Sequence, residues 1–387
     1  TVFDMGQSSV YEDDDRNCEA VLRAARLCYL PACEMLLKLV RRFEGAFVVS
    51  LCVSGTALDL FEQYAPEVTE SLCALAATGC VEFVAETSAH SLAFLYSREE
   101  FDRQVKKQSA RLKSLFGKKP TAFMHTECVF NNDLAAALQQ LGFKTALAQG
   151  TDHVLGWRSP NWVYRPVSAP RMQLLRFGDR AWSGWPLTAD KYASWLHSLG
   201  NSGDVINIFN DIHMFGLRHA PDSGIFDFMA ALPGALLEDS RFSFATPASL
   251  PAKLKPAGEV DVPQFMSWED NGNDLTTWLG NDMQKDAIHA LYSLAARVRA
   301  CGQKMLLHDY ERLQTADHFR YMSTRWFSGP RQDRPNPFDS PYDAYITYMN
   351  VLADFELRLD AAELASKTVK TRRVSRSSLS SGTGASA

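Results

Sequence analysis

Short apolar runs alternate along the chain with amphipathic stretches. The apolar runs are typical of strands and lie at 46–53, 80–85, 121–127, 145–148, 173–177, 205–211 and 242–246. The amphipathic stretches carry apolar residues every three or four positions, as helices do, and lie at 17–42, 101–116, 133–141, 189–199 and 225–237. This alternation predicts βαβ units and therefore an α/β fold with a parallel sheet.

The pattern changes after residue 250. A polar link at 254–263 leads into helical stretches at 284–301 and 342–364, with no strand between them. From residue 366 the chain is rich in Ser, Gly and Thr, carries five basic residues and has almost no apolar side chains to bury. We therefore predict three parts: a (β/α) barrel at 1–250, a helical region at 251–365, and a disordered basic tail at 366–387.

Acidic residues end two of the predicted strands. Glu127 closes the run 121–127, and Asp211 closes the run 205–211. A parallel barrel collects the carboxyl ends of its strands on one face, so two carboxylates far apart in sequence can meet there. Such a pair can cleave a glycosidic bond. An acid in this position is also a common helix cap or turn residue, so position alone does not decide between these roles.

Composition agrees with a globular enzyme. The 387 residues include 46% hydrophobic and 22% charged side chains, enough for a large core. A net charge of −5 gives no reason to expect nucleic acid or an acidic membrane as partner, and a neutral, hydroxyl-rich substrate suits it better. No apolar stretch reaches transmembrane length and no signal peptide is visible. The oligomeric state leaves no signal in the sequence.

The eight cysteines form no CxxC pair and no cluster with zinc spacing. Several of them sit inside apolar runs, which predicts buried free thiols. Free thiols are typical of a reducing compartment, so we predict a cytoplasmic location.

Four segments resemble signature segments of glycoside hydrolase family 57, the α-amylase and 4-α-glucanotransferase family. Residues 79–91, 125–133, 209–216 and 313–319 are similar to its second, third, fourth and fifth segments. Residues 153–157 and 340–345 are similar to stretches of its α-amylase-like branch. The order and spacing also fit, so the resemblance extends to about residue 359.

The resemblance implies a (β/α)7 TIM-like barrel followed by a C-terminal helical bundle, which contributes to the active site. It makes Glu127 the nucleophile and Asp211 the general acid/base of a retaining reaction on α-1,4-glucans or malto-oligosaccharides, with no cofactor and no metal. Water as the acceptor would make the enzyme a hydrolase, and a sugar hydroxyl would make it a 4-α-glucanotransferase.

The resemblance also implies substrate-binding residues. Glu82 and Asp317 stand where the family places carboxylates that bind sugar hydroxyls, and His125 and His213 flank the catalytic pair. Aromatic faces can cover the apolar side of a sugar ring, or they can pack in the core or at its rim. The candidates for this role are Trp157, Trp162, Trp182 and Trp185.

Three departures from the family leave alternatives open. The chain lacks an N-terminal strand with the family's His-Gln-Pro motif, so we expect the first barrel strand to be missing. His213 stands where family members usually have a glutamate. The stretch 174–185 is shorter than its counterparts in the family. A glucan-binding homologue with weak turnover is therefore a second hypothesis. A metal-dependent barrel deacetylase built on 211–213 is a third, but no further His-x-x-x-His pair supports it.

Overall fold

The computed structural model describes residues 11–169, 173–177, 188–268, 272–326 and 336–380. The chain forms two compact units. The larger unit contains Asp14–Phe94 and Arg98–Thr277, and the smaller unit contains Thr1–Asp13, Leu95–Ser97 and Trp278–Ala387. The division therefore falls between Thr277 and Trp278, later than the boundary at residue 250 that we expected.

Parallel strands form the centre of the larger unit. They are β1 (Val49–Cys52), β2 (Val81–Val84), β3 (Ala122–Met124), β4 (Thr145–Gln149) and β6 (Gln173–Phe177). β1 pairs with β2, and β3, β4 and β6 pair in that order. A single bridge joins the two sets, because Ala85 N donates to Ala122 O at 3.1 Å and Met124 N donates to Ala85 O at 2.9 Å. The carboxyl ends of these strands thus point the same way, as predicted for a parallel sheet.

Two short strands extend the sheet beyond β6. β5 (Tyr164–Pro166) is antiparallel to β6 and parallel to β7 (Gly258–Val260), and neither was predicted. The predicted strands at 205–211 and 242–246 are wrong, since both segments are loops. Their apolar residues Ile206 and Phe244 pack against the cluster formed by two helices, so packing and not strand pairing explains the apolar pattern.

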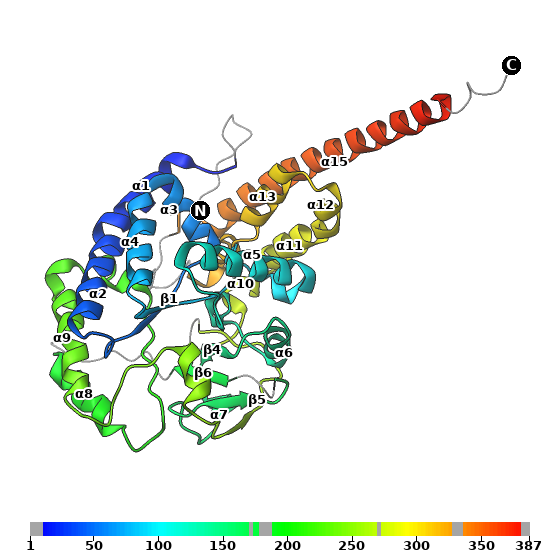
Figure 1. Ribbon diagram of the computed structural model, residues 1–387. Coiled ribbons are helices and arrows are strands. Elements are labelled where there is room, and N and C mark those ends of the chain that lie inside the picture. The colour runs from blue at the N-terminus through cyan, green and yellow to red at the C-terminus, as the bar shows by residue number, and fades with distance from the viewer. Residues whose placement is uncertain (1–10, 170–172, 178–187, 269–271, 327–335, 381–387) are drawn as a thin grey trace. The chain divides into compact units, whose positions relative to one another are not determined.

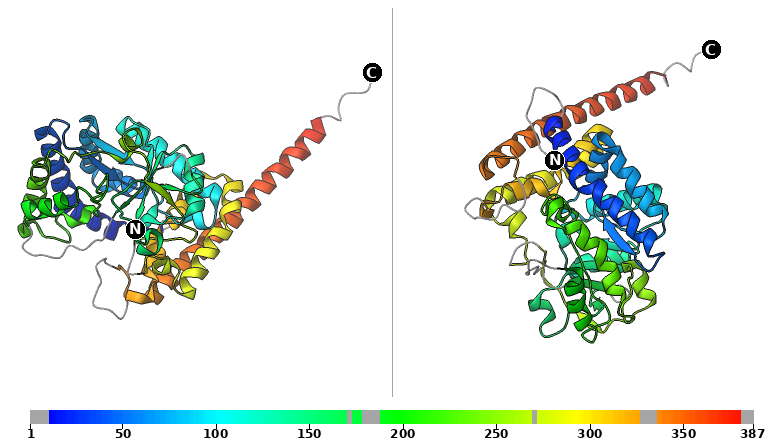
Figure 2. Two further views of the ribbon diagram at one scale, coloured as in Figure 1. Left: turned by 90° about the horizontal axis from the view of Figure 1, so that it is seen from below. Right: turned by 90° about the vertical axis from the view of Figure 1, so that its left-hand side faces the viewer.

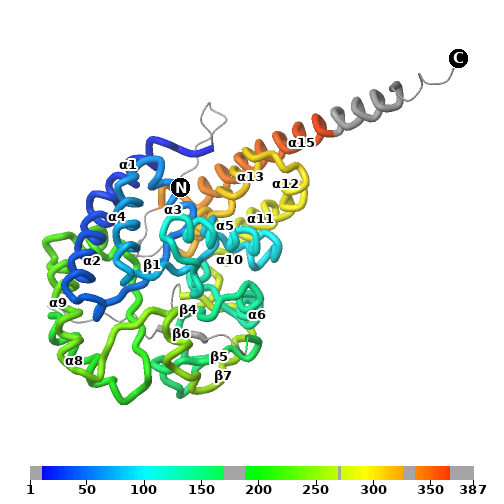
Figure 3. The backbone as a smooth tube through the Cα atoms, in the orientation of Figure 1, coloured from blue at the N-terminus to red at the C-terminus, as the bar shows by residue number. Residues whose placement is uncertain are grey.

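Helices precede and separate the strands of the larger unit along the chain. They are α1 (Asp14–Ala24), α2 (Leu30–Arg42), α3 (Gly55–Tyr64), α4 (Pro66–Ala77), α5 (Arg98–Phe116), α6 (Asn132–Gln140), α7 (Asp152–Leu155), α8 (Ala189–Ser198) and α9 (Ile225–Leu237). Ser54 and Asn131 cap α3 and α6, accepting from Ala57 N at 3.1 Å and Leu134 N at 2.8 Å. α2 contacts α4 and α9, and α8 lies beside α9 (Figure 3).

A π-helical turn, η1 (Ala25–Tyr29), connects α1 to α2. The sequence predicted one helix interrupted at Pro31; in the structure the wider turn precedes this proline, which lacks the N–H that an α-helix requires. The remaining short turns are η2 (Ala93–Leu95), η3 (Thr126–Cys128), η4 (Ile212–Met214), η5 (Pro221–Ser223), η6 (Pro247–Ala252) and η7 (Thr324–Trp326).

The smaller unit is helical. α10 (Thr276–Leu279) leads into α11 (Asp282–Ser293), α12 (Ala295–Cys301), α13 (Lys304–Leu313), α14 (Ala316–Tyr321) and α15 (Pro341–Ser380). Its core contains the fully buried side chains of Trp278, Tyr310, Phe319, Tyr348 and Phe355. Figure 2 shows α15 as one continuous helix, which packs on α11 to α14.

α15 extends to Ser380, past residue 366 where the sequence predicted the start of the basic tail, and residues 381–387 lie outside the described part of the chain. Within the described ranges, no helix is both long and apolar enough to cross a membrane.

Candidate functional site

Glu127 lies in a tight turn at the carboxyl end of β3. Its backbone has φ 54° and ψ 31°, and Cys128 has φ 53°, so two successive non-glycine residues adopt the left-handed conformation. Cys128 N donates to His125 O at 2.8 Å and closes the turn. Strained conformations of this kind concentrate at functional sites, where the surroundings hold them in place. The turn leaves the Glu127 side chain nearly buried, with the residue 8% exposed.

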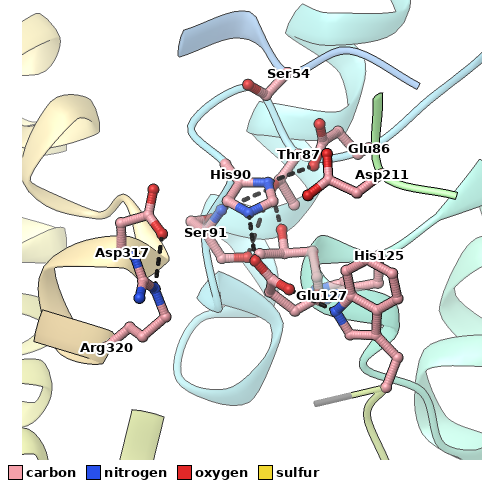
Figure 4. A network of polar contacts seen from close by, with 12 residues as sticks. Ser54, Glu86, Thr87, His90, Ser91, His125, Glu127, Asp211, Asp317 and Arg320 are labelled. Atoms are coloured by element: carbon pink, nitrogen blue, oxygen red, sulfur yellow. Dashed lines mark hydrogen bonds and ion pairs between the residues drawn. The ribbon is translucent and has the colours of Figure 1, made fainter. Parts of the chain in front are cut away.

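Each carboxylate oxygen of Glu127 has a nitrogen partner. Trp268 Nε1 donates to Oε2 at 2.6 Å, and His90 Nε2 lies 3.2 Å from Oε1. Figure 4 shows the His90 ring between Glu127 and Glu86, with a contact to each. Hydrogen bonds to both oxygens orient the carboxylate and stabilise its ionised form.

His90 bridges two buried carboxylates. Its Nδ1 lies 2.8 Å from Oε2 of Glu86, a residue only 5% exposed. Burial alone would lower the pKa of His90, but the charge of Glu86 and the hydrogen bonds to Glu127 and Glu86 outweigh it and raise this pKa well above its usual value. His90 is therefore an imidazolium that donates to both carboxylates.

The loop that carries His90 is held from two sides. Ser91 N donates to Thr87 Oγ1 at 2.8 Å, and Ser91 Oγ donates to Gln104 Oε1 of α5 at 2.7 Å. On the other side, α3 starts with Gly55, where a Cβ would stand 2.5 Å from Ser88 O. Only glycine permits this close approach, so both helices fix the position of the imidazole.

Asp211 lies in a loop that follows the extended segment 205–210. Its Oδ1 accepts from His213 N at 3.0 Å and lies 3.3 Å from His213 Nδ1, and its Oδ2 accepts from Arg218 Nη2 at 3.0 Å. Burial would raise the pKa of Asp211, but the hydrogen bonds and charge of His213 and the charge of Arg218 hold it well below the usual value. Asp211 is therefore ionised in the free chain; Figure 4 draws it in the same close view as His90 and Glu127.

Glu82 lies at a different level of the sheet from Glu127. Ala85 pairs with Phe123, and Glu82 stands three residues, about 10 Å, before this bridge, whereas Glu127 lies beyond the carboxyl end of β3. Its Oε2 accepts from Ala248 N at 3.1 Å, and burial raises its pKa. The structure therefore gives Glu82 the role of anchoring η6 and does not bring it to Glu127.

His125 is buried beneath the turn. Its Nδ1 lies 3.2 Å from Thr126 O, and its ring stacks on Phe101 with centroids 5.7 Å apart. Burial lowers the pKa of His125 to about 4, so the ring is neutral. Its Nε2 has no hydrogen-bond partner among the described residues. His125 therefore supports the strand end and makes no hydrogen bond to Glu127.

The other predicted binding residues lie in other elements of the fold. Trp157 follows α7 and is 94% exposed, while Trp182 and Trp185 lie outside the described residues. Asp317 belongs to α14 of the smaller unit, where its Oδ1 accepts from Arg320 Nε at 3.3 Å. Among the described residues, no group of three or more His, Cys, Asp or Glu side chains could hold a metal ion.

Comparison with known proteins identifies the family. The sequence profile described as Glycosyl hydrolase family 57 matches residues 2–263. A protein of Methanocaldococcus jannaschii named "Putative alpha-amylase" is 33% identical over 368 residues, which cover 89% of this chain and 78% of that protein. The chain belongs to glycosyl hydrolase family 57. The predicted family membership is thus confirmed.

Several solved structures share the fold. A branching enzyme from Thermococcus kodakaraensis is 13% identical with a TM-score of 0.65, over 92% of this chain and 87% of that chain. An α-amylase from Thermotoga maritima is 11% identical with a TM-score of 0.62, over 94% and 91%. A 4-α-glucanotransferase from Thermococcus litoralis is 16% identical with a TM-score of 0.62, over 78% of this chain and about half, 53%, of that chain. The predicted barrel with a C-terminal helical region is confirmed.

Four side chains around Glu127 and Asp211 were not predicted. Glu86 and His90 lie inside the segment 79–91 that carries the family resemblance, so the resemblance marked their location but not their role. Trp268 and Arg218 stand in loops with no local pattern. Trp268 is 141 residues from Glu127 in sequence, and only the fold brings the two together.

Proposed function

We propose that the chain is a retaining, α-amylase-like glycoside hydrolase that acts on α-1,4-glucans, with Glu127 as nucleophile and Asp211 as general acid/base. The observation that carries this proposal is the environment of Glu127. A strained turn holds its carboxylate at the carboxyl end of β3, and a nitrogen donor meets each oxygen. A nucleophile of this reaction has to be ionised and fixed in direction, and this arrangement supports both.

The reaction proceeds in two halves. In the first, a Glu127 oxygen bonds to C1 of the glucosyl unit while the bond from C1 to the leaving oxygen breaks, and Asp211 gives its proton to that oxygen. In the second, Asp211 takes a proton from water, whose oxygen bonds to C1 and displaces Glu127. His90 and Trp268 orient the Glu127 carboxylate for both halves of the reaction.

Asp211 has to be protonated before the first half begins. In the free chain it is ionised, with a side chain 19% exposed and bonded to Arg218, whose own side chain is 36% exposed. A glucan that excludes water from this carboxylate disfavours its charge and raises its pKa. We infer that Asp211 gains its proton as the glucan binds and the bond to Arg218 breaks. The ionised state seen here suits the second half, when Asp211 acts as base.

Two further expectations accompany this proposal. The first barrel strand would be missing next to β1. Among the described strands, β1 pairs only with β2, and its four residues are all half-buried. All eight cysteines are free thiols in the structure, which supports a reducing compartment, the cytoplasm.

The test is to incubate the chain, Glu127→Gln and Asp211→Asn with maltoheptaose and to resolve the products by length. We expect only shorter products from the unchanged chain and none from either variant. Products both longer and shorter than the substrate would make the chain a 4-α-glucanotransferase. An activated aryl maltoside separates the two roles, because its leaving group needs no proton: release of the aryl group recovers in Asp211→Asn but not in Glu127→Gln.

A glucan-binding homologue is the second candidate, and the ion pair between Asp211 and Arg218 favours it, because an aspartate held ionised is a poor acid. It predicts that maltoheptaose stays intact while calorimetry detects its binding to both the unchanged chain and Glu127→Gln. Intact maltoheptaose without binding would reject both candidates.

A further inference from the structure

The π-helical turn η1 packs against the Asp211 loop, although the two are far apart in sequence. Cys28 Sγ donates to Ile212 O at 3.1 Å. Gly216 has φ +93°, and a Cβ there would stand only 1.8 Å from Leu27 O. No side chain fits at that distance, so the two backbones lie in direct contact. π-Helical turns are rare and often occur at functional sites, so the side chains of η1 are candidates for a functional role.

Tyr29, the last residue of η1, begins a series of polar contacts that ends at Asp211. Its hydroxyl lies 2.8 Å from Nε2 of His213, and Nδ1 of the same imidazole lies 3.3 Å from Asp211 Oδ1. An ionised aspartate only accepts hydrogen bonds, so Nδ1 has to carry a hydrogen. In neutral His213 the Nε2 atom is then an acceptor, and Tyr29 is its donor.

We propose that Tyr29 is a positioning residue for the acid/base Asp211, because its hydroxyl fixes the Nδ1–H tautomer of His213. This inference rests on the proposed function of Asp211. Without the hydroxyl, a neutral imidazole is free to carry its hydrogen on Nε2, and the bond to Asp211 is lost in that form. The residue that departs from the family pattern, His213, thus depends on a tyrosine 184 positions earlier in the chain.

The surrounding groups are consistent with a donor role for Tyr29. Burial raises the pKa of Tyr29, and the charge of the nearby Asp211 raises it further, so the hydroxyl keeps its proton. Burial also raises the pKa of the Cys28 thiol to about 12, so this neighbour stays uncharged. Among the described residues, the charged or titratable groups near Asp211 include His213 and Arg218 from its own loop and Cys28 and Tyr29 from η1, and Figure 4 draws Glu86 and His90 close by.

Nitrogen-15 NMR of the His213 side chain, recorded on its neutral form, tests the tautomer directly. We expect Nδ1–H in the unchanged chain and a mixture with Nε2–H in Tyr29→Phe, which keeps the ring contact with Phe61 at 5.0 Å. The matched control is Tyr164→Phe, which loses a hydroxyl bonded to Ser159 O at 2.6 Å and should leave the His213 signals unchanged.

Kinetics supply the second measurement. Tyr29→Phe should lower kcat on maltoheptaose about five- to tenfold with little change in KM, the effect of one hydrogen bond, and move the alkaline limb of the pH profile upward. His213→Asn puts an amide N–H near the place of Nδ1 and needs no tyrosine. In the chain that carries His213→Asn, adding Tyr29→Phe should neither lower kcat further nor move the pH profile.

An Nε2–H tautomer in the unchanged chain would overturn the proposal, even if Tyr29→Phe failed to fold. Unchanged His213 signals and an unchanged pH profile in Tyr29→Phe would overturn it as well. If the unchanged chain does not cleave maltoheptaose, the proposed function fails, but the NMR measurement still decides whether Tyr29 sets the tautomer. The two failures are therefore distinguishable.

Discussion

His90 makes two contacts that single substitutions can separate. An asparagine amide reaches the place of Nδ1, which faces Glu86, and a glutamine amide reaches the place of Nε2, which faces Glu127. His90→Asn therefore keeps the contact with Glu86 and loses the one with Glu127, whereas His90→Gln does the reverse. His90 has φ 51°, a conformation that asparagine tolerates better than most residues.

The expected magnitudes follow from the two contacts. A hydrogen bond to a charged group contributes about 1.5–3 kcal/mol, and about 1.4 kcal/mol corresponds to a tenfold change in rate. His90→Asn should therefore lower kcat/KM on maltoheptaose by about 10- to 150-fold. His90→Gln leaves Glu86 buried without its ion-pair partner and should lower the free energy of unfolding by about 1.5–3 kcal/mol, with a smaller loss of activity.

Urea unfolding across pH provides the assay for stability. The pKa of His90 is raised in the folded chain, so its stabilising effect is complete below about 6.5, the pKa of an unfolded histidine, and is lost as the pH rises through the folded value. The difference in unfolding free energy between the unchanged chain and His90→Gln should thus be largest near pH 6 and shrink under alkaline conditions. A difference independent of pH, or equal loss of activity in both variants, would refute the reasoning.

Three further substitutions test the surroundings of the pair. Arg218→Met removes a cation from Asp211 and raises its pKa, so the alkaline limb of the kcat profile should move to higher pH; a downward shift would contradict the assignment. Trp268→Phe removes the N–H bonded to Glu127 and should lower kcat/KM by about 10- to 100-fold, with a melting temperature close to that of the unchanged chain. Glu82→Leu should lower the unfolding free energy by about 1–2 kcal/mol and leave kcat within about twofold, and a large loss of kcat would return Glu82 to the substrate site.

Sequence alone predicted the position of Glu127 but not how Asp211 is held. The run 121–127 is apolar because β3 pairs on both sides, with Ala85 and with β4, and is therefore buried. Glu127 follows in the turn at its carboxyl end. The run 205–211 has a similar pattern, yet Val205 N bonds to Asn161 O, a loop carbonyl. An apolar run reports burial and not strand pairing, so the two runs look alike in sequence.

The missing parts of the site depend on distant contacts. Nothing near Trp268 marks it as a partner of Glu127, and His90 resembles any other polar loop residue until its two carboxylates are placed. Glu82 matches a position of the family motif, but the motif did not reveal its level along the strand. Positions along a strand are reliable from sequence only when the register with its neighbours is known.

A retaining reaction makes different demands on its two carboxylates. The nucleophile has to stay ionised until it bonds to C1. The proposed nucleophile, Glu127, has a well-anchored partner, because His90 lies in a loop that is bonded to α5 through Ser91. The acid/base has to change its protonation state twice in each cycle. Arg218, which is paired with Asp211, has a side chain 36% exposed against 19% for Asp211, so a bound glucan can remove that interaction without disturbing the core. The anchored partners of Glu127 and the more exposed partner of Asp211 therefore support the roles proposed for the two acids.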